Sequence, residues 1–381
     1  MFSFLNTFIQ KSRKMFLIWW IWILFLILPL VKYSAVPQGY EISKFIFWQI
    51  WWLAYLLWFL LTGEWRNLLS IKSPAVKMGW IFILIMLFTS FQGKEVSLLG
   101  SVFRKQGWFF FFQLWIFFLG LRGNKKELFP LSFQGLGLST VILVGIGIWE
   151  RFVGWARVGG SFGEPNAFGG YLVLVFPLLL NKRWWFAGIL ALIGVYLTES
   201  RSAAVALGVA IAVSLIGRVK SHKITIIQTA VFGLIIISTI FFTYNWRGLR
   251  ISLQDNRLGI WKMAVNAIIA RPLSGYGVDN IEGVLNNFVS GKDLGMKGLV
   301  IDRAHSLFLD LWLWSGVFGV ISFIGFLGGI IWEYIKSGKN KDWNLIASIF
   351  SFLVFSSFNP ISISIWVLFY WVLAMVSKTE K

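Results

Sequence analysis

Long apolar runs alternate with short polar segments along almost the whole chain. A helix that crosses a membrane needs about 20 mostly apolar residues, and somewhat shorter runs are tolerated. This pattern predicts an all-α polytopic membrane protein with about twelve transmembrane helices, in a single integral membrane domain over residues 1–381. The predicted spans are residues 16–31, 45–62, 78–91, 107–121, 128–149, 167–180, 184–198, 202–217, 224–243, 306–332, 343–358 and 361–376.

One long hydrophilic segment, residues 244–304, interrupts this pattern between the ninth and tenth predicted spans. Inside it, residues 255–268 have helical spacing, which places four apolar side chains on one face. We expect this amphipathic helix to lie on the membrane surface or across the mouth of the helix bundle. The four apolar residues of the expected face are Leu258, Trp261, Val265 and Ile268.

The distribution of charge predicts the orientation of the chain. The sequence has 35 Lys and Arg residues against 16 Asp and Glu residues, a balance that often indicates nucleic acid or another anionic partner. Here most of the basic residues lie in one alternating set of short loops, such as residues 11–14, 122–126 and 218–223. Short basic loops remain in the cytoplasm, so we expect both termini to be cytoplasmic and the long loop to be extracytoplasmic. The basicity is then a topology signal, and nucleic acid is not an expected partner.

Cysteine is absent from the sequence, which excludes a disulfide framework and a cysteine-ligated metal. The acidic residues on the predicted outer side are scattered, without the paired carboxylates that suit Mg²⁺. There is also no Walker-type glycine-rich loop for a nucleotide. We therefore predict no metal and no cofactor.

Polar residues of the types that bind anions or transfer protons gather on the predicted outer side. Arg201 sits among small residues at the edge of the bilayer, where its guanidinium needs an anion, either Glu199 or a phosphate. Arg257 lies in the first turn of the predicted loop helix, where a cation opposes the helix dipole. His305 begins the tenth span and is either a general base or an ordinary helix-start residue. In the segment 159–167, Asn166 is expected to cap the following helix.

Several of these segments match motifs of a known family. The sequences SFGEPNAFGGYL, TESRSA, NRLGIWKMAVNAI, RPLSGYGVDN and RAHSLFLDLWLWSGVFG occur in this order. Together they resemble the O-antigen ligase and O-antigen polymerase superfamily of multi-span bacterial glycosyltransferases, over roughly residues 97–332. One departure is that the family commonly has His-Asn where this chain has His305-Ser306, which leaves the role of the second position open.

The resemblance implies a function and a set of site residues. Members of the superfamily move a glycan from a polyprenyl (undecaprenyl) diphosphate to an acceptor, on the outer face of the bacterial cytoplasmic membrane. Carried over to this chain, Arg201 and Arg257 hold the donor diphosphate and His305 is the catalytic base. Arg104 and Arg303 are candidates for further phosphate contacts. Two guanidiniums can stabilise a leaving diphosphate without a metal, and the donor bond itself supplies the driving force without ATP.

Three kinds of acceptor remain open within this reading. They are a lipid-core sugar, as for a ligase, another growing glycan, as for a polymerase, and a protein Ser or Thr hydroxyl. We expect the ligase type. The alternative from a different class is a multi-span transporter, but the sequence shows no matching halves and almost no charge in the centres of the spans.

Overall fold

The computed structural model describes residues 2–33, 39–62, 72–122, 125–181, 183–220, 257–288, 301–337 and 341–378. Within these ranges the chain forms α-helices, two short 3₁₀ helices and no strand, as the apolar pattern predicts. The helices are α1 (Phe2–Ile27), α2 (Gly39–Thr62), α3 (Pro74–Ser90), α4 (Lys94–Leu99), α5 (Trp108–Arg122), α6 (Lys125–Phe152), η2 (Gly160–Phe162), α7 (Pro165–Leu179), α8 (Trp185–Thr198), α9 (Arg201–Lys220), α11 (Arg257–Ala270), α12 (Glu282–Leu285), η3 (Asn286–Phe288), α13 (Leu307–Lys336), α14 (Trp343–Ser356) and α15 (Ile363–Val376).

Every predicted span except one coincides with a helix; the exception, residues 224–243, lies outside the described residues. Three helical stretches are long and apolar enough to cross a bilayer: Gly39–Thr62, Pro130–Phe152 and Leu307–Lys336. Eight further apolar helices are 10–17 residues long. These helices are those of a membrane protein, whereas the number of crossings and their orientation remain predictions.

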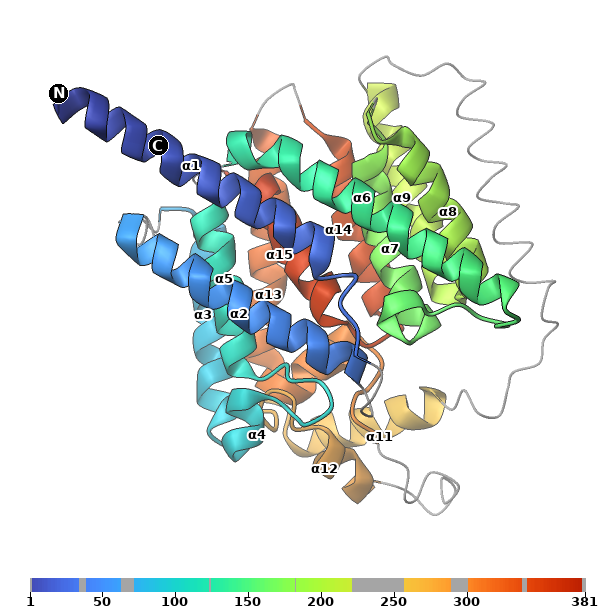
Figure 1. Cartoon of the computed structure of the whole chain (residues 1–381). Coiled ribbons are helices and arrows are strands. Elements are labelled where there is room, and N and C mark those ends of the chain that lie inside the picture. The colour runs from blue at the N-terminus through green and yellow to red at the C-terminus, as the bar shows by residue number, and fades with distance from the viewer. Residues whose placement is uncertain are drawn as a thin grey trace.

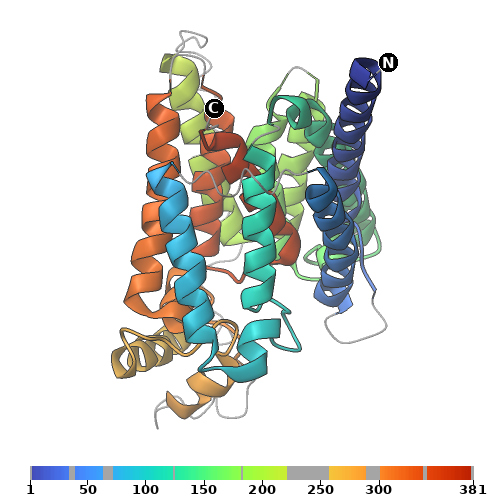
Figure 2. The same ribbon diagram turned by 90° about the vertical axis from the view of Figure 1, so that its left-hand side faces the viewer.

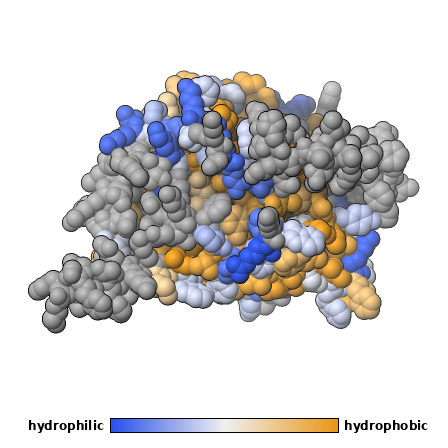
Figure 3. All heavy atoms as spheres, turned by 90° about the horizontal axis from the view of Figure 1, so that it is seen from above, coloured by the Kyte–Doolittle hydropathy of each residue, from blue (hydrophilic) through white to orange (hydrophobic). Residues whose placement is uncertain are grey.

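The long helices run side by side in a bundle (Figures 1 and 2). Helix α13 packs on α3, α14 packs on α9 and α7, and α1 packs on α6. Helices α4, α11 and α12 lie together at one end of the bundle, which we call the α11 end (Figure 1). At the opposite end, the Arg122 guanidinium donates to Ser377 Oγ at 3.2 Å and to the Lys378 carbonyl at 2.9 Å, which joins α5 to the end of α15. Seen from that side, hydrophilic side chains lie among hydrophobic ones (Figure 3).

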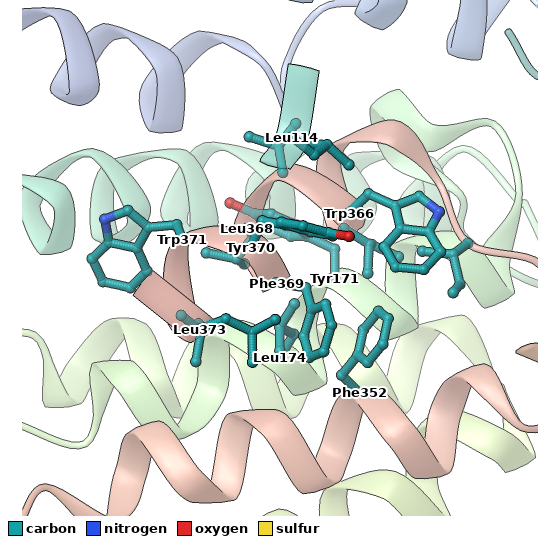
Figure 4. Close-up of a cluster of buried hydrophobic side chains, with 14 of the residues drawn as sticks. Leu114, Tyr171, Leu174, Phe352, Trp366, Leu368, Phe369, Tyr370, Trp371 and Leu373 are labelled. Carbon is teal, nitrogen blue, oxygen red and sulfur yellow. The ribbon is translucent and has the colours of Figure 1, made fainter. Parts of the chain in front are cut away.

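Helix α15 forms the centre of the core. All of its residues, Ile363–Val376, are buried. Figure 4 shows aromatic and aliphatic side chains of α5, α7 and α14 around it, and the rings of Phe352 and Phe369 stack with centroids 3.7 Å apart. Such a helix, apolar on every side, is held by packing against protein.

Helix α13 is interrupted at Gly316, whose φ of 64° and ψ of −174° are not helical. A break leaves backbone N–H and C=O groups without helical partners, and these must bond elsewhere in an apolar interior. The loop 271–277 supplies the partners in three hydrogen bonds: Tyr276 N–H to Leu313 O (2.6 Å), Gly277 N–H to Trp314 O (3.1 Å) and Val317 N–H to Pro272 O (2.9 Å).

The predicted loop helix is present as α11, but its buried face differs from the expected one. Leu258 is 77% exposed and Val265 is 44% exposed. The buried residues are Gly259, Met263, Ala264, Ala267 and Ile268, of which Ile268 belongs to the predicted face. Helix α11 packs on α13, and the small residues of its buried face allow a close approach. The position of its apolar face on the membrane surface stays a prediction.

Candidate functional site

The principal candidate residues lie where helices begin. Arg201 is the first residue of α9, Arg257 is the first residue of α11, and His305 lies two residues before α13. Backbone N–H groups at helix starts lack helical acceptors, so such places favour anionic ligands. The side-chain contacts below bring these separate helix starts together.

The junction between α8 and α9 presents Arg201 to the outside. Glu199 has a left-handed backbone (φ 49°) and ends α8, and Ser200 Oγ donates to Asn166 Oδ1 at 2.8 Å. The Glu199 carboxylate lies 3.6 Å from the Arg151 guanidinium. Arg201 is exposed and has no hydrogen bond or ion pair within the part of the chain that the structure describes. Of the two partners expected for Arg201, Glu199 lies instead beside Arg151, and an anionic ligand of Arg201 stays a prediction.

Asn166 links this junction to the preceding loop. Its Oδ1 also accepts a hydrogen bond from Arg157 Nη2 at 3.1 Å. The capping role predicted for Asn166 was wrong, because Glu164 occupies the N-cap position of α7 and accepts the Ala167 N–H at 3.2 Å. Pro165 follows as the first helical residue, so Asn166 is already inside the first turn.

Asn359, between α14 and α15, connects α11 to α9. Arg257 Nη2 donates to Asn359 Oδ1 at 3.5 Å, and Asn359 Nδ2 donates to Ser202 Oγ at 2.6 Å. Asn359 is 1% exposed, so its amide is fixed. Arg257 is thereby placed beside the first turn of the helix that Arg201 begins. Sequence reasoning missed Asn359, although an Asn-Pro pair directly after an apolar span was a usable signal.

Arg104 forms an ion pair near His305. Its Nε lies 2.6 Å from Asp302 Oδ2, and both side chains are partly buried. Burial alone would raise the pKa of Asp302, but the positive charge of Arg104, together with Arg303 and His305, lowers it below its usual range. Burial likewise opposes the charged form of Arg104, but Asp302 and nearby carboxylates raise its pKa. Both groups are therefore ionised in the folded protein.

Arg303 is buried in a second ion pair. Its Nη2 lies 2.5 Å from Asp279 Oδ1 and donates to Gln106 Oε1 at 3.2 Å, and its guanidinium stacks over the Trp314 ring. Asp279 Oδ2 also accepts the backbone N–H of Ser101 at 2.6 Å. Arg303 and Asp279 are each 2% exposed. Both Asp279 and Gln106 were missed by sequence reasoning, since nothing local marks them.

Two groups of residues contact the connection between α14 and α15: the Arg257 group (Arg257, Asn359 and Ser202) and the Arg303 group (Arg303, Asp279 and Gln106). Gln106 Nε2 donates to the Ile361 carbonyl at 2.8 Å, two residues after Asn359. Glu41 Oε2 accepts the Ile363 N–H at 3.0 Å from the other side. One short segment thus contacts the Arg257 group through Asn359 and the Arg303 group through Ile361.

His305 is partly exposed and has a left-handed backbone, with φ 55°. The other non-glycine residues with positive φ in the described ranges are Lys105, Glu199 and Asp279. Each of the four belongs to, or directly adjoins, a segment of the candidate site. This backbone conformation is costly for such residues and concentrates at functional sites, where the surrounding structure enforces it.

The described residues contain no group of three or more His, Asp and Glu side chains suited to a metal ion. The described residues offer guanidinium groups that can pair with an anion, and His305 follows three residues after Asp302, the partner of Arg104.

Comparison with known proteins identifies the part of the chain that carries these residues. The sequence profile of the O-antigen ligase family matches residues 186–324. Over these residues the chain is similar to the O-antigen ligase family. The family that the motifs suggested is thus confirmed, and Arg201, Arg257, Arg303 and His305 all lie within the O-antigen ligase match.

A curated protein is also similar to this chain. It is the ComP-specific O-oligosaccharyltransferase of Acinetobacter baylyi (strain ATCC 33305 / BD413 / ADP1), which is 27% identical over 293 residues. The match covers 68% of this chain and 48% of the relative, so the chain spans about half the length of the curated protein that it matches.

Proposed function

We propose that this protein is a membrane glycosyltransferase of the O-antigen ligase type. It moves a glycan from a polyprenyl diphosphate donor to an acceptor hydroxyl. The observation that carries the proposal is the meeting of Arg257, Asn359 and Ser202, which brings together two helix starts with arginines. Among the described residues, the exposed Arg201 side chain at one of these starts has no partner. The match of the ligase family to this same region supports it.

The two arginines act on the leaving group. When the bond between the anomeric carbon and the diphosphate oxygen breaks, negative charge grows on the diphosphate. Arg201 and Arg257 each offer a planar guanidinium, which pairs well with phosphate oxygens and stabilises this charge. Arg104 is partly exposed and better placed than Arg303 for a further phosphate contact, because Arg303 is buried against Asp279.

His305 is the base for the acceptor. Its imidazole takes the proton from the acceptor hydroxyl as the oxygen forms a bond to the anomeric carbon and the diphosphate leaves. The base acts from its neutral form, in which a ring nitrogen can accept the proton.

The site faces the outer side of the bacterial cytoplasmic membrane in this proposal, and both termini are cytoplasmic. The bias of basic residues toward alternate loops supports this orientation. Because Arg122 and Lys378 lie opposite the α11 end, the α11 end is the outer one.

A protein hydroxyl is our second choice of acceptor, because the Acinetobacter baylyi relative is named as an O-oligosaccharyltransferase specific for ComP. A lipid-core sugar remains the first choice, and a growing glycan, as for a polymerase, is the third. All three present an alcohol to the same base, so they differ in what binds beside His305 and leave the chemistry unchanged.

Purified protein in lipid vesicles tests the proposal. It is supplied with an undecaprenyl-diphosphate-linked glycan and, in parallel, with a lipid-core, a glycan and a protein acceptor, and the glycosylated product is detected by mass. We expect transfer to one acceptor, and its loss in His305→Ala while membrane insertion is retained. His222→Ala, at the other histidine, is the matched control and should be active. Full activity of His305→Ala would remove the base assignment, and absence of transfer to all three acceptors would refute the proposal.

A further inference from the structure

The three residues that precede His305 are each held by a different part of the chain. Two of them form the ion pairs described above, and the third is held through its backbone. The contacts are Asp302 with Arg104 (2.6 Å), Arg303 with Asp279 (2.5 Å) and the Ala304 N–H with Asp310 Oδ1 (2.8 Å).

The contact of Asp310 is the one closest to His305 along the chain. Asp310 lies in the first turn of α13 and is 4% exposed. Its own N–H donates to the Ser306 carbonyl at 2.8 Å as part of the helix. Its carboxylate reaches back past the helix start to the Ala304 N–H, one residue before His305. Ser306, the N-cap residue, makes no side-chain capping bond, and the Asp310 side chain instead ties the first turn of α13 to the segment before it.

The backbone of His305 needs such support. Its φ of 55° is uncommon for a residue with a side chain and persists only where the surroundings hold it. The Ala304 N–H belongs to the Arg303–Ala304 peptide, and Ala304 alone joins that peptide to His305, whose backbone sets where the imidazole points. A hydrogen bond to Ala304 therefore controls the direction of the proposed base.

We propose that Asp310 is a positioning residue for His305. Its oxygen accepts the Ala304 N–H and so fixes the Arg303–Ala304 peptide, from which the chain enters the uncommon His305 backbone that aims the imidazole at the acceptor hydroxyl. This role requires a hydrogen-bond acceptor at position 310, whereas the negative charge of Asp310 is dispensable. This inference rests on the proposed function, in which His305 is the base.

A conservative pair of substitutions separates the acceptor atom from the charge. Asp310→Asn keeps an oxygen that can accept the Ala304 N–H, and Asp310→Leu has a similar shape without an acceptor. Ser322→Ala is the matched control, since this buried residue of the same helix bonds only within α13, to the Gly319 carbonyl. The full-length variants are reconstituted in vesicles, and kcat and donor KM are measured with the wild-type donor and acceptor.

We expect Asp310→Leu to lower kcat by about 10- to 100-fold with a donor KM within about threefold of wild type, because a small misplacement of a catalytic group has an effect of this size. Asp310→Asn and Ser322→Ala should retain kcat within about threefold. If Asp310→Leu does not fold, Asp310→Ser, whose hydroxyl is too short to reach Ala304, replaces it with the same expected result.

Two results overturn the inference. One is an equal loss of kcat in Asp310→Asn and in the Leu or Ser variant, which lacks the hydrogen-bond acceptor. This result would assign the role to the charge of Asp310. The other is wild-type kcat in those variants, or a rise in donor KM alone. A wild-type protein without transfer activity would instead overturn the proposed function, so the two failures are distinguishable.

Discussion

The break in α13 gives a sharp test of how the α11 end is held together. Gly316 has backbone angles that only glycine adopts readily, and a Cβ atom there would fall inside contact distance of the Leu273 carbonyl oxygen. Gly316→Ala therefore strains the backbone of α13 and pushes the loop 271–277 away from it. Gly275, on the loop side, is equally confined: a Cβ there would lie 2.7 Å from the Leu313 carbonyl oxygen.

The size of the effect follows from the contacts that are lost. A residue with a side chain in this backbone region costs about 1–3 kcal/mol. Displacing the loop also breaks the bonds from the Tyr276 and Gly277 N–H groups, each contributing about 0.5–1.5 kcal/mol. We expect Gly316→Ala to lower the free energy of unfolding by about 2–6 kcal/mol, a large part of the stability of an ordinary domain.

Gly328 is the matched control in the same helix. A Cβ atom at Gly328 has no neighbour within 4 Å, so Gly328→Ala should be neutral or should stabilise α13 by up to about 1 kcal/mol. The measurements are thermal unfolding and denaturant titration of the purified variants in detergent. A Gly316→Ala protein within about 0.5 kcal/mol of wild type, a typical limit for inconsequential substitutions, would refute this account of the break.

Three further predictions concern the site. Arg201→Lys keeps the charge but loses the planar fork, so the donor KM should rise by about tenfold or more in the vesicle transfer assay; an unchanged KM would count against a bidentate phosphate contact. Transfer should proceed at an unchanged rate in EDTA, because the arginines carry the charge of the leaving diphosphate, and inhibition by the chelator would contradict this. The pKa of Asp302 is lowered from 3.8, so its pair with Arg104 stabilises the fold above about pH 4 and loses this effect as the pH falls through the lowered pKa. The melting temperature of Asp302→Asn should accordingly lie below that of wild type at pH 7, and the difference should disappear in acid; a difference that is independent of pH would be the contrary result.

Much of the fold follows from the hydropathy of the chain. Apolar runs locate helices well, because a backbone in lipid satisfies its polar groups inside the helix itself. The prediction for α11 illustrates the limit. The helix and its start at Arg257 are correct, but the residues that face α13 are the small ones. Periodicity ranks side chains by apolar area, whereas the contact between α11 and α13 depends on how closely two backbones approach.

The residues of the candidate site likewise fall into those that the sequence indicates and those that only the structure reveals. Arg201, Arg257 and His305 could be found because each lies in a local motif at the edge of an apolar run. Asn359, Asp279 and Asp310 were missed, because their contacts depend on the folded chain. Asn359 contacts Arg257, 102 positions away, and Asp279 contacts Gln106, 173 positions away. Asp310 is close to Ala304 in sequence, but its role depends on the uncommon backbone conformation of His305.

These missed residues explain why the motifs can work together. Each motif residue stands at a helix start, and a helix start by itself fixes only one end of one helix. The guanidiniums and the imidazole need a common frame if they are to act on a single donor and acceptor. The connection between α14 and α15 supplies that frame, because Asn359 contacts Arg257 and Ser202 while the Ile361 carbonyl accepts from Gln106, which contacts Arg303. The fully buried helix α15 follows directly from this connection, so a packed helix anchors the segment that relates the residues proposed to bind the donor and activate the acceptor.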